Sequence, residues 1–386
     1  MESTRLSAAS PSVAVPVVAL TFYAVSSGFL MSLIPLIVEQ AHWSNTLASW
    51  LASVFYAGLL LGSLVIEPLV NKLGHRKAFI LSLLVFIAAI VPLMQQQWPM
   101  AWLVARFIAG ISVASIFVIV ESWLLFGNPE QRAKRLGIYM ASLYGGSAVG
   151  QLAISEIGIH GMMPFVFILT LLVSGVFSLF VPMTEPPKQD HCQPISLKRL
   201  FGLNHAALMG CVVSGLLLGS IYGLLPLALK MRGITLDNIG TLMAAAIMGG
   251  MAVQPLISKL SSIMGRTLLM ALCCLVGMAG VGVSSMYNDV LILGSSLFVM
   301  GMAAFALYPV AINLGCQNLP EHEIVSATQI MLFSYSIGSV SGPLIANPFL
   351  GTSSGLMGYL FAIFAATTVY MLLAALKRKP ELSMPE

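Results

Sequence analysis

Two charged residues lie inside one long apolar stretch, and their chemistry is the first clue to what the chain does. Arg106 lies about five residues inside the stretch 101–125, and Glu121 lies 15 residues further along. A charge facing lipid costs roughly 2.5–3.5 kcal/mol at the bilayer centre. We therefore expect Arg106 to face the protein interior or a watery cavity, where a guanidinium can bind an anion or bias a proton site. The alternative is a side chain that reaches up to the headgroups.

Glu121 is about 22 Å from Arg106 along the same helix, at 1.5 Å per residue, so the two residues cannot pair directly. It lies instead near the polar segment that carries Arg76 and Lys77. Glu67 occupies a similar boundary position. For both carboxylates the alternative is a solvated side chain at the membrane surface. Glu39, Glu156 and Asp237 all lie at the ends of apolar stretches.

The elements that must hold these residues are membrane helices. Of 386 residues, 58% are hydrophobic and 8% are charged, against roughly 25% charged in a soluble domain. A crossing helix needs about 20 apolar residues. Windows of that size predict twelve spans: 13–38, 45–69, 78–95, 101–125, 136–156, 163–183, 204–229, 236–258, 267–286, 290–316, 323–346 and 353–376. The first is too long for a cleaved signal peptide.

Basic residues predict the orientation of these spans. With a cytoplasmic N-terminus, 15 of the 18 Lys and Arg residues fall on the cytoplasmic side, and only Lys230 and Arg232 fall outside. Lys and Arg resist translocation, so both termini are expected in the cytoplasm. The net charge of +4 is thus a topology signal, and no nucleic-acid partner is expected. The five cysteines are expected to be reduced.

The chain contains an internal repeat at an offset of 191 residues. At this offset Gly28, Gly58, Gly74 and Gly110 align with glycines, and Pro35 aligns with Pro226. After a one-residue slip, Gly146 and Gly150 align with Gly338 and Gly342. The repeat predicts an N-terminal six-helix bundle over 1–183, a polar cytoplasmic linker over 184–203 and a C-terminal bundle over 204–386. Glycines four residues apart predict close helix packing, which is either static or a surface where helices slide. Arg106 aligns with Leu297 and so has no charged counterpart.

Three motifs carry a family resemblance. The segment EPLVNKLGHRKAFIL (67–81) is similar to the loop signature of the major facilitator superfamily, and RFIAG (106–110) is similar to its fourth-helix signature. GSAVG (146–150) and GSVSGP (338–343) are similar to the signature of its fifth and eleventh helices. The whole chain resembles this superfamily, and within it the bacterial YcaD-like branch. Asn71 stands where the loop signature usually has an acid, and Glu67 replaces its first glycine.

The resemblance implies an all-α membrane fold with a central cavity between helices one, four, seven and ten. It also implies a cytoplasmic gate, in which Glu121 pairs with Arg76 or a neighbouring base and to which Glu67 and Asn71 belong. Each polar residue could equally bond between helices. The cavity candidates are Tyr23, Ser27, Arg106, Ser112, Ser115, Gln151, Tyr222, Tyr308, Asn313 and Gln329.

The function expected from these features is secondary transport of a small organic molecule across a bacterial inner membrane. No phosphate-binding loop and no H-E-x-x-H motif occurs in the sequence, so neither ATP-driven transport nor zinc hydrolysis is expected. We expect no cofactor, no metal and no enzymatic activity. The expected partners are the substrate, protons and membrane lipid, and the chain is expected to be a monomer. A facilitator without ion coupling and a non-transporting membrane receptor remain as alternatives.

Overall fold

The structure is a computed structural model that describes residues 13–95, 98–125, 129–182, 204–317, 319 and 321–377. Over these residues the chain forms twelve α-helices, with short 3₁₀ turns η1 (Val91–Met94) and η3 (Asn347–Gly351). The α-helices are α1 (Ala14–Gln40), α2 (Asn45–Leu73), α3 (His75–Ile90), α4 (Pro99–Leu125), α5 (Pro129–Ile157), α6 (Met163–Ser178), α7 (His205–Met231), α8 (Leu236–Ile263), α9 (Arg266–Met286), α10 (Val290–Gly315), α11 (Glu321–Ala346) and α12 (Gly355–Lys377).

Nine helices of the described chain are long and apolar enough to cross a membrane. The apolar helix α6 is shorter, at 16 residues, while α5 and α11 begin with polar and charged turns. Every predicted span corresponds to a helix. The ends differ most at α5, which begins at Pro129, seven residues before its predicted span. Backbone hydrogen bonding lets a helix continue past the apolar stretch, so hydrophobicity alone misplaces its end.

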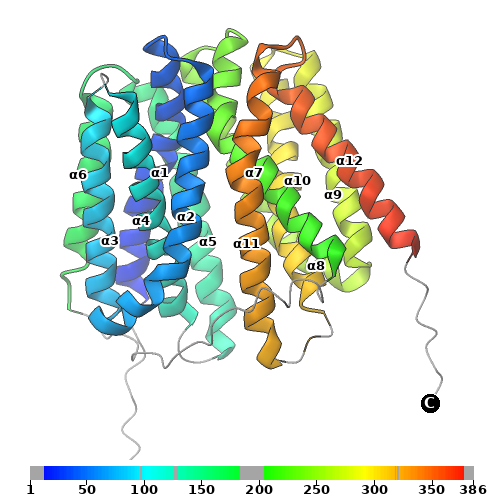
Figure 1. Ribbon diagram of the computed structural model, residues 1–386, viewed down its shortest axis with the longest axis horizontal. Coiled ribbons are helices and arrows are strands. Elements are labelled where there is room, and N and C mark those ends of the chain that lie inside the picture. The colour runs from blue at the N-terminus through cyan, green and yellow to red at the C-terminus, as the bar shows by residue number, and fades with distance from the viewer. Residues whose placement is uncertain are drawn as a thin grey trace, which may run out of the picture.

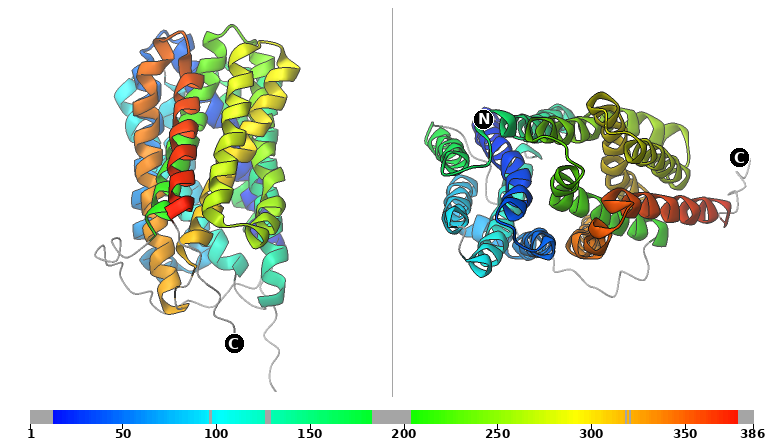
Figure 2. Two further views of the ribbon diagram at one scale, coloured as in Figure 1. Left: turned by 90° about the vertical axis from the view of Figure 1, so that its right-hand side faces the viewer. Right: turned by 90° about the horizontal axis from the view of Figure 1, so that it is seen from above.

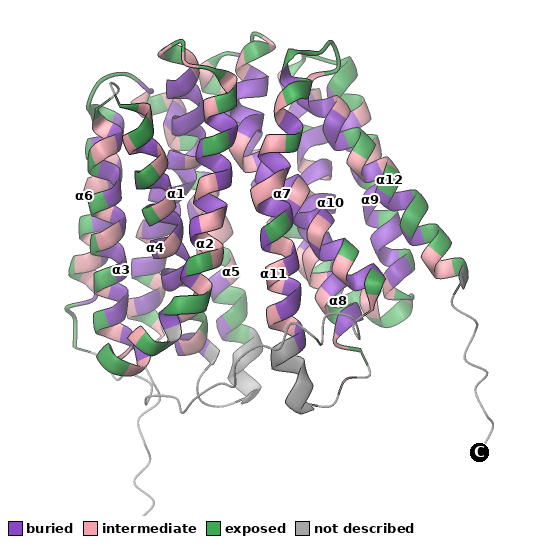
Figure 3. Cartoon of the chain, viewed as in Figure 1, coloured by how far each residue is buried: buried purple, intermediate pink, exposed green. Residues whose placement is uncertain are grey.

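The helices form two six-helix bundles that lie side by side (Figure 1), and the division is also visible from above (Figure 2). In the N-terminal bundle α1 packs against α5 and α6, and α2 packs against α4. In the C-terminal bundle α7 packs against α11, and α8 against α10. Exposed residues gather on the outer flanks, including those of α9 and α12 (Figure 3). The predicted linker 184–203 lies outside the described residues.

The top of Figure 1, where α1 ends and α2 begins, is called the upper end here, and the opposite end the lower end. The helices alternate in direction, so α1 begins and α12 finishes at the lower end. Among the helix starts that the structure describes, Ser44 caps α2, Asn204 caps α7 and Asp289 caps α10 with their side chains. Each cap accepts a hydrogen bond from a backbone N–H of the first turn, a group that has no partner within the helix.

Glycine contacts repeat between the two bundles residue by residue. A Cβ on Gly58 of α2 would meet the carbonyl oxygen of Phe107 on α4, and one on Gly249 of α8 would meet that of Phe298 on α10. These residues are related by the same 191-residue offset. Three further contacts follow the repeat in the same way. Gly110 against Phe55 corresponds to Gly301 against Ala246, Gly150 against Val25 corresponds to Gly342 against Leu216, and Gly146 against Thr21 corresponds to Gly338 against Val212. The repeat read from the sequence is therefore a repeat of backbone packing.

Candidate functional site

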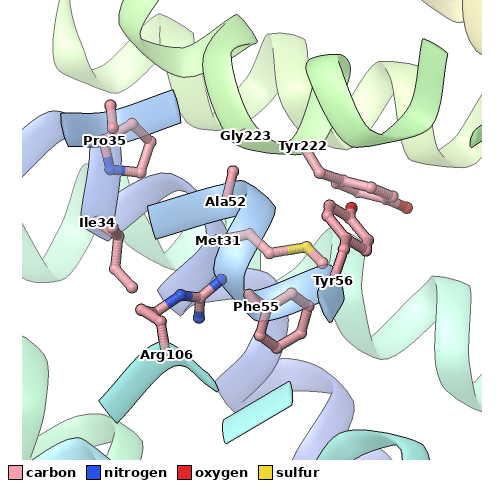
Figure 4. Close-up of a pocket in the computed structure, with 10 residues that line it drawn as sticks. Met31, Ile34, Pro35, Ala52, Phe55, Tyr56, Arg106, Tyr222 and Gly223 are labelled. Atoms are coloured by element: carbon pink, nitrogen blue, oxygen red, sulfur yellow. The ribbon is translucent and has the colours of Figure 1, made fainter. Parts of the chain in front are cut away.

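A small cavity lies between the two bundles, and its lining residues are 3 to 11 positions from the upper ends of their helices. Its volume is about 20 Å³, which is room for about one water molecule. Three helices of the N-terminal bundle and one of the C-terminal bundle form its wall (Figure 4). The lining residues are Met31, Ile34 and Pro35 of α1, Ala48, Ala52, Phe55 and Tyr56 of α2, Arg106 of α4, and Tyr222 and Gly223 of α7.

Arg106 provides the positive charge of this cavity. Its side chain is buried, and the guanidinium carbon lies 4.1 Å from the centroid of the Phe55 ring. Its Nε atom is buried without a hydrogen-bond partner. No carboxylate of a described residue forms an ion pair with it. The ring face of Phe55 offsets part of the charge through a cation–π contact. The remaining charge makes Arg106 a receptor for an anionic group.

Two prolines lie inside the helices that line the cavity. Pro35 of α1 and Pro226 of α7 are aligned by the repeat, and each lacks the N–H that a helix donates to the carbonyl four residues earlier. Those carbonyls belong to Met31 and Tyr222, and both residues line the cavity. Each half therefore contributes one backbone carbonyl without its usual helical partner. Such carbonyls can accept hydrogen bonds from a cation or from a substrate.

Aromatic rings from both bundles meet beside the cavity, and two of these residues, Tyr56 and Tyr222, also line it. Tyr144 of α5 and Tyr222 of α7 both contact the Phe305 ring of α10 edge-on, with centroids 5.5 and 5.8 Å away. Tyr308 of α10 lies against Tyr335 of α11 at 4.9 Å. We call these five residues, together with Tyr56, the aromatic layer. The layer joins the bundles through apolar ring contacts, and its hydroxyl groups can hydrogen-bond a ligand.

Sequence reasoning named Tyr222 and Tyr308 of this layer but missed Tyr56, Tyr144, Phe305 and Tyr335. Tyr144 and Tyr335 lie 191 residues apart, one short of the 192-residue spacing that relates Gly146 of α5 to Gly338 of α11, so the repeat does not align the two tyrosines. The repeat therefore gives no signal for this pair, and the sequence does not show which aromatic residues face the other bundle.

The bundles are tied together at the upper end. Ser49 of α2 donates a hydrogen bond to Asn347 Oδ1 at 3.0 Å, and Asn347 Nδ2 donates to Thr46 Oγ1 at 3.3 Å. Asn45 Nδ2 contacts Met231 Sδ at 3.9 Å. Between side chains that the structure describes, these three contacts are the hydrogen bonds that join the bundles. At the lower end the facing helices α4 and α10 expose Glu121 and Asn313. Of the described residues, those at the upper end thus hydrogen-bond the two bundles together, and we call this end the closed one.

Four of the other predicted cavity residues lie inside the N-terminal bundle and hydrogen-bond within it. Tyr23 is buried against Phe86 and Phe117, and its hydroxyl donates a hydrogen bond to Ser27 Oγ at 3.3 Å. Ser112 donates to the Ser82 carbonyl of α3, and Ser115 donates to the Ile111 carbonyl of its own helix. Both serine hydroxyls thus satisfy backbone carbonyls, and Ser112 lies toward α3 rather than toward the other bundle.

Gln151 joins α5 to α1. Its Nε2 donates to the Gly28 carbonyl at 2.8 Å, and its Oε1 accepts from Ser32. The side chain is fully buried, so this interhelical bond is its structural role. Of the two remaining candidates, Asn313 of α10 is exposed and Gln329 of α11 is half-buried.

The predicted gate residues lie near the lower end, but no ion pair joins Glu121 to Arg76. Glu121 Oε1 instead accepts a hydrogen bond from the Tyr139 hydroxyl of α5 at 2.8 Å. Next to it, buried His75 of α3 lies 3.1 Å from Ser122 Oγ, a contact that sequence reasoning missed. Asn71 is half-buried, and the side chain of Glu67 lies outside the described residues. A gate pair that forms only when the lower end closes would be apart in this arrangement.

Comparison with known proteins shows which family the chain resembles. The sequence model of the Major Facilitator Superfamily matches residues 17–343. An uncharacterized MFS-type transporter, YcaD of Escherichia fergusonii, is 30% identical over 92% of this chain and 93% of its own length. A second uncharacterized MFS-type transporter, from an Enterobacter species, is 31% identical over the same shares.

Two solved structures have the same fold. The nucleoside transporter NupG has a TM-score of 0.75 at 13% identity, covering 95% of this chain and 98% of that one. A bacterial homologue of the human lysosomal transporter Spinster, in an inward-facing and occupied conformation, has a TM-score of 0.70 at 15% identity, covering 94% of each chain. The two-bundle fold, the glycine repeat and these matches together show that the chain is a multi-pass membrane protein of the major facilitator superfamily.

Proposed function

We propose that this protein is a secondary transporter that moves a small organic molecule across the cytoplasmic membrane by alternating access. The observation that carries the proposal is Arg106, a buried cation without a carboxylate partner among the described residues, at a cavity shared by both bundles. A buried charge is expensive to keep unless it has a task. We assign the lower end to the cytoplasm because the bias of Lys and Arg favours that side.

The substrate class follows from the groups around the cavity. Arg106 supplies one positive charge, while the aromatic layer supplies ring faces and hydroxyl groups. An organic anion or a neutral amphiphile with a ring or apolar body fits this lining. A bulky cation does not, because it would meet Arg106. With the upper end closed, the described state is the one that loads or releases substrate on the cytoplasmic side.

Coupling to protons is the default for such a transporter without a nucleotide-binding motif. Glu121 is the acid closest to this role, because it lies on α4 below the aromatic layer and hydrogen-bonds Tyr139. A facilitator without ion coupling is the second candidate. A membrane receptor that binds without moving its ligand is the third.

A flux assay separates these functions. The protein is reconstituted in proteoliposomes with an imposed pH gradient, and pooled metabolites and amphiphiles are screened with wild type, Arg106→Ala and the control Lys230→Gln. Gradient-dependent flux that disappears only in Arg106→Ala supports a proton-coupled carrier. Flux that ignores the gradient identifies a facilitator. A ligand that raises the melting temperature but is never moved overturns transport in favour of a receptor.

A further inference from the structure

A second cavity lies at the upper end of the C-terminal bundle, away from the interface of the two bundles. Its volume is about 490 Å³, within the range of cavities that hold small-molecule ligands. It lies between the end of α7, the end of α9, η3 and the first turn of α12. One part of the wall is apolar, with Met231, Gly282 and Phe361. The other part is polar, with Arg232 and the hydroxyl-bearing turn Thr352–Ser354.

Arg232 is a fixed cation in this wall. Its guanidinium donates to the carbonyls of Ser284 and Tyr287, at 2.8 and 3.0 Å, and to Asn288 Oδ1 at 2.7 Å. All three acceptors are neutral, so none of them cancels the positive charge. A guanidinium has five N–H donors, which leaves some of them for a ligand. Partial burial lowers the pKa of Arg232 from its usual range, and a bound anion would oppose that shift.

The polar wall offers further hydrogen-bond donors for an anion. The first turn of α12 borders the cavity at Gly355, Leu356 and Met357. The N–H groups of a helix's first turn have no partner within the helix and carry a partial positive charge. Ser354 places a hydroxyl group beside this turn. The Thr352 hydroxyl holds the turn instead, because it donates to the Phe349 carbonyl at 2.7 Å and accepts from the Gly355 N–H at 3.2 Å. Arg232 and this turn together form a positive pole on one side of the cavity.

The apolar wall continues into the outer surface of the bundle. Phe361 of α12 is 41% exposed. Val283 and Met286 of the neighbouring helix α9 and Leu372 of α12 are exposed as well. This is the flank that lipid chains cover in a membrane protein. The positive pole lies at the ends of the helices, at the level of the headgroups. The cavity is therefore positive at headgroup depth and apolar where it meets the hydrocarbon.

The equivalent place in the N-terminal bundle differs. Ala41 aligns with Arg232 at the repeat offset, and it has no side-chain donor. There Gln40 Nε2 lies 2.7 Å from His160 Nδ1 and closes the turn between α5 and α6 against α1. The cation is thus particular to the C-terminal bundle. Lys230 and Arg232 are also the two basic residues that the orientation places outside the cytoplasm.

We propose that this upper cavity of the C-terminal bundle binds one anionic phospholipid, with its phosphate on Arg232 and the first turn of α12 and one acyl chain along Gly282 and Phe361. The lipid would tie α7, α9 and α12 together at their upper ends. The shared chemistry of a phosphate group also admits free phosphate, so the test must distinguish lipid from ion.

The test measures lipid retention on purified protein by native mass spectrometry, and it needs no transport substrate. Protein is titrated with phosphatidylglycerol or with phosphatidylcholine. Wild type is expected to retain one phosphatidylglycerol in preference to phosphatidylcholine. Arg232→Gln is expected to weaken that retention about tenfold, the usual effect of losing one charge-assisted hydrogen bond. Lys230→Gln, which removes the neighbouring cation outside the cavity, is expected to retain lipid as wild type does.

A second variant covers the risk that Arg232→Gln misfolds. A Cβ on Gly282 would meet only a ring carbon of Phe361 at 3.8 Å, so Gly282→Leu fits on α9 and fills the cavity while leaving Arg232 in place. It is expected to displace the lipid. Equal retention by wild type, Arg232→Gln and Gly282→Leu overturns the proposal. So does equal loss in Lys230→Gln, which would show nonspecific attraction. If inorganic phosphate at millimolar concentration displaced the phosphatidylglycerol, the proposed lipid site would be overturned in favour of a site for a small anion.

Discussion

The two bundles share their backbone packing but differ in the side chains that they place on it. Gly110 contacts the Phe55 carbonyl in the N-terminal bundle, and Gly301 contacts the Ala246 carbonyl in the C-terminal bundle. At these same helix crossings Arg106 lies over the Phe55 ring, whereas its counterpart Leu297 is buried in an apolar core. The repeated part of the molecule is therefore its scaffold. The chemistry is carried by positions where the repeat fails.

The largest expected effect tests whether the glycine contacts of both bundles tolerate an added side chain equally poorly. Gly58→Leu and Gly249→Leu each place a side chain against a backbone carbonyl, of Phe107 and Phe298 respectively. Even modest overpacking costs about 1–3 kcal/mol, and a backbone cannot move aside as a side chain can. We expect both variants to lose folded, monodisperse protein in size-exclusion chromatography. Gly137→Leu, with nothing within 4 Å of its added Cβ, is the matched control and stays folded. Tolerance in one bundle alone would break the equivalence.

Next in size is the effect of removing the charge that the repeat does not explain. Arg106→Met keeps the length of the side chain but removes the cation. We expect flux of the identified substrate to fall roughly 10- to 100-fold, as for a lost charge-assisted contact. The melting temperature should not fall, because replacing a buried charge by an apolar group is often neutral or stabilising.

Leu297→Ala is expected to behave in the opposite way, with a stability loss of about 2–5 kcal/mol and little change in the flux per folded molecule. Both quantities can be measured on the same preparations, by uptake and by thermal melting. If Arg106→Met unfolds the protein while its transport survives per folded molecule, then Arg106 is a structural residue and the contrast between the halves is not a functional one.

A smaller effect concerns the α1–α5 contact. Gln151 bridges Gly28 and Ser32 there, whereas the aligned residue in α11 is Pro343, which cannot form such a bridge. Gln151→Leu removes the acceptor of the buried Ser32 hydroxyl, at a cost of about 1–3 kcal/mol, while the Gly28 carbonyl keeps its hydrogen bond within α1. We expect a lower melting temperature. Gln254→Leu, whose half-buried amide bonds only within α8, is the control. An equal loss in both variants would mean that the bridge adds nothing specific.

The smallest effect concerns the closed upper end. Ser49 and Gly240 are aligned by the repeat and lie at the two interfaces between the bundles. Ser49 hydrogen-bonds Asn347, while Gly240 contacts the Gln151 carbonyl directly. Ser49→Ala should weaken closure by about 0.5–1.5 kcal/mol, a shift of up to about tenfold in the ratio of closed to open molecules. Distances between spin labels at the upper end would report that shift. Gly240→Ala, which places a methyl group against the Gln151 backbone, should open the upper end more than Ser49→Ala does. A larger opening in Ser49→Ala than in Gly240→Ala would mean that the hydrogen bond dominates closure.

Hydrophobicity and glycine spacing are enough to predict the twelve helices and the repeat, because both are set by the bilayer and by backbone contact. The interior position of Arg106 is predictable from the cost of a charge in lipid. The roles of Ser112 and Ser115 are not, because α4 is apolar on every face and its sequence does not show which way it is rotated. Their hydroxyl groups satisfy backbone carbonyls, as serines in apolar helices commonly do.

The upper end is held closed by two amides, two hydroxyl groups and a thioether, and no ion pair joins the bundles there among the described side chains. Contacts between neutral groups are not screened by salt, whereas exposed charge pairs weaken as the Debye length falls. Closure on that side should therefore be insensitive to the ionic strength of the surrounding medium.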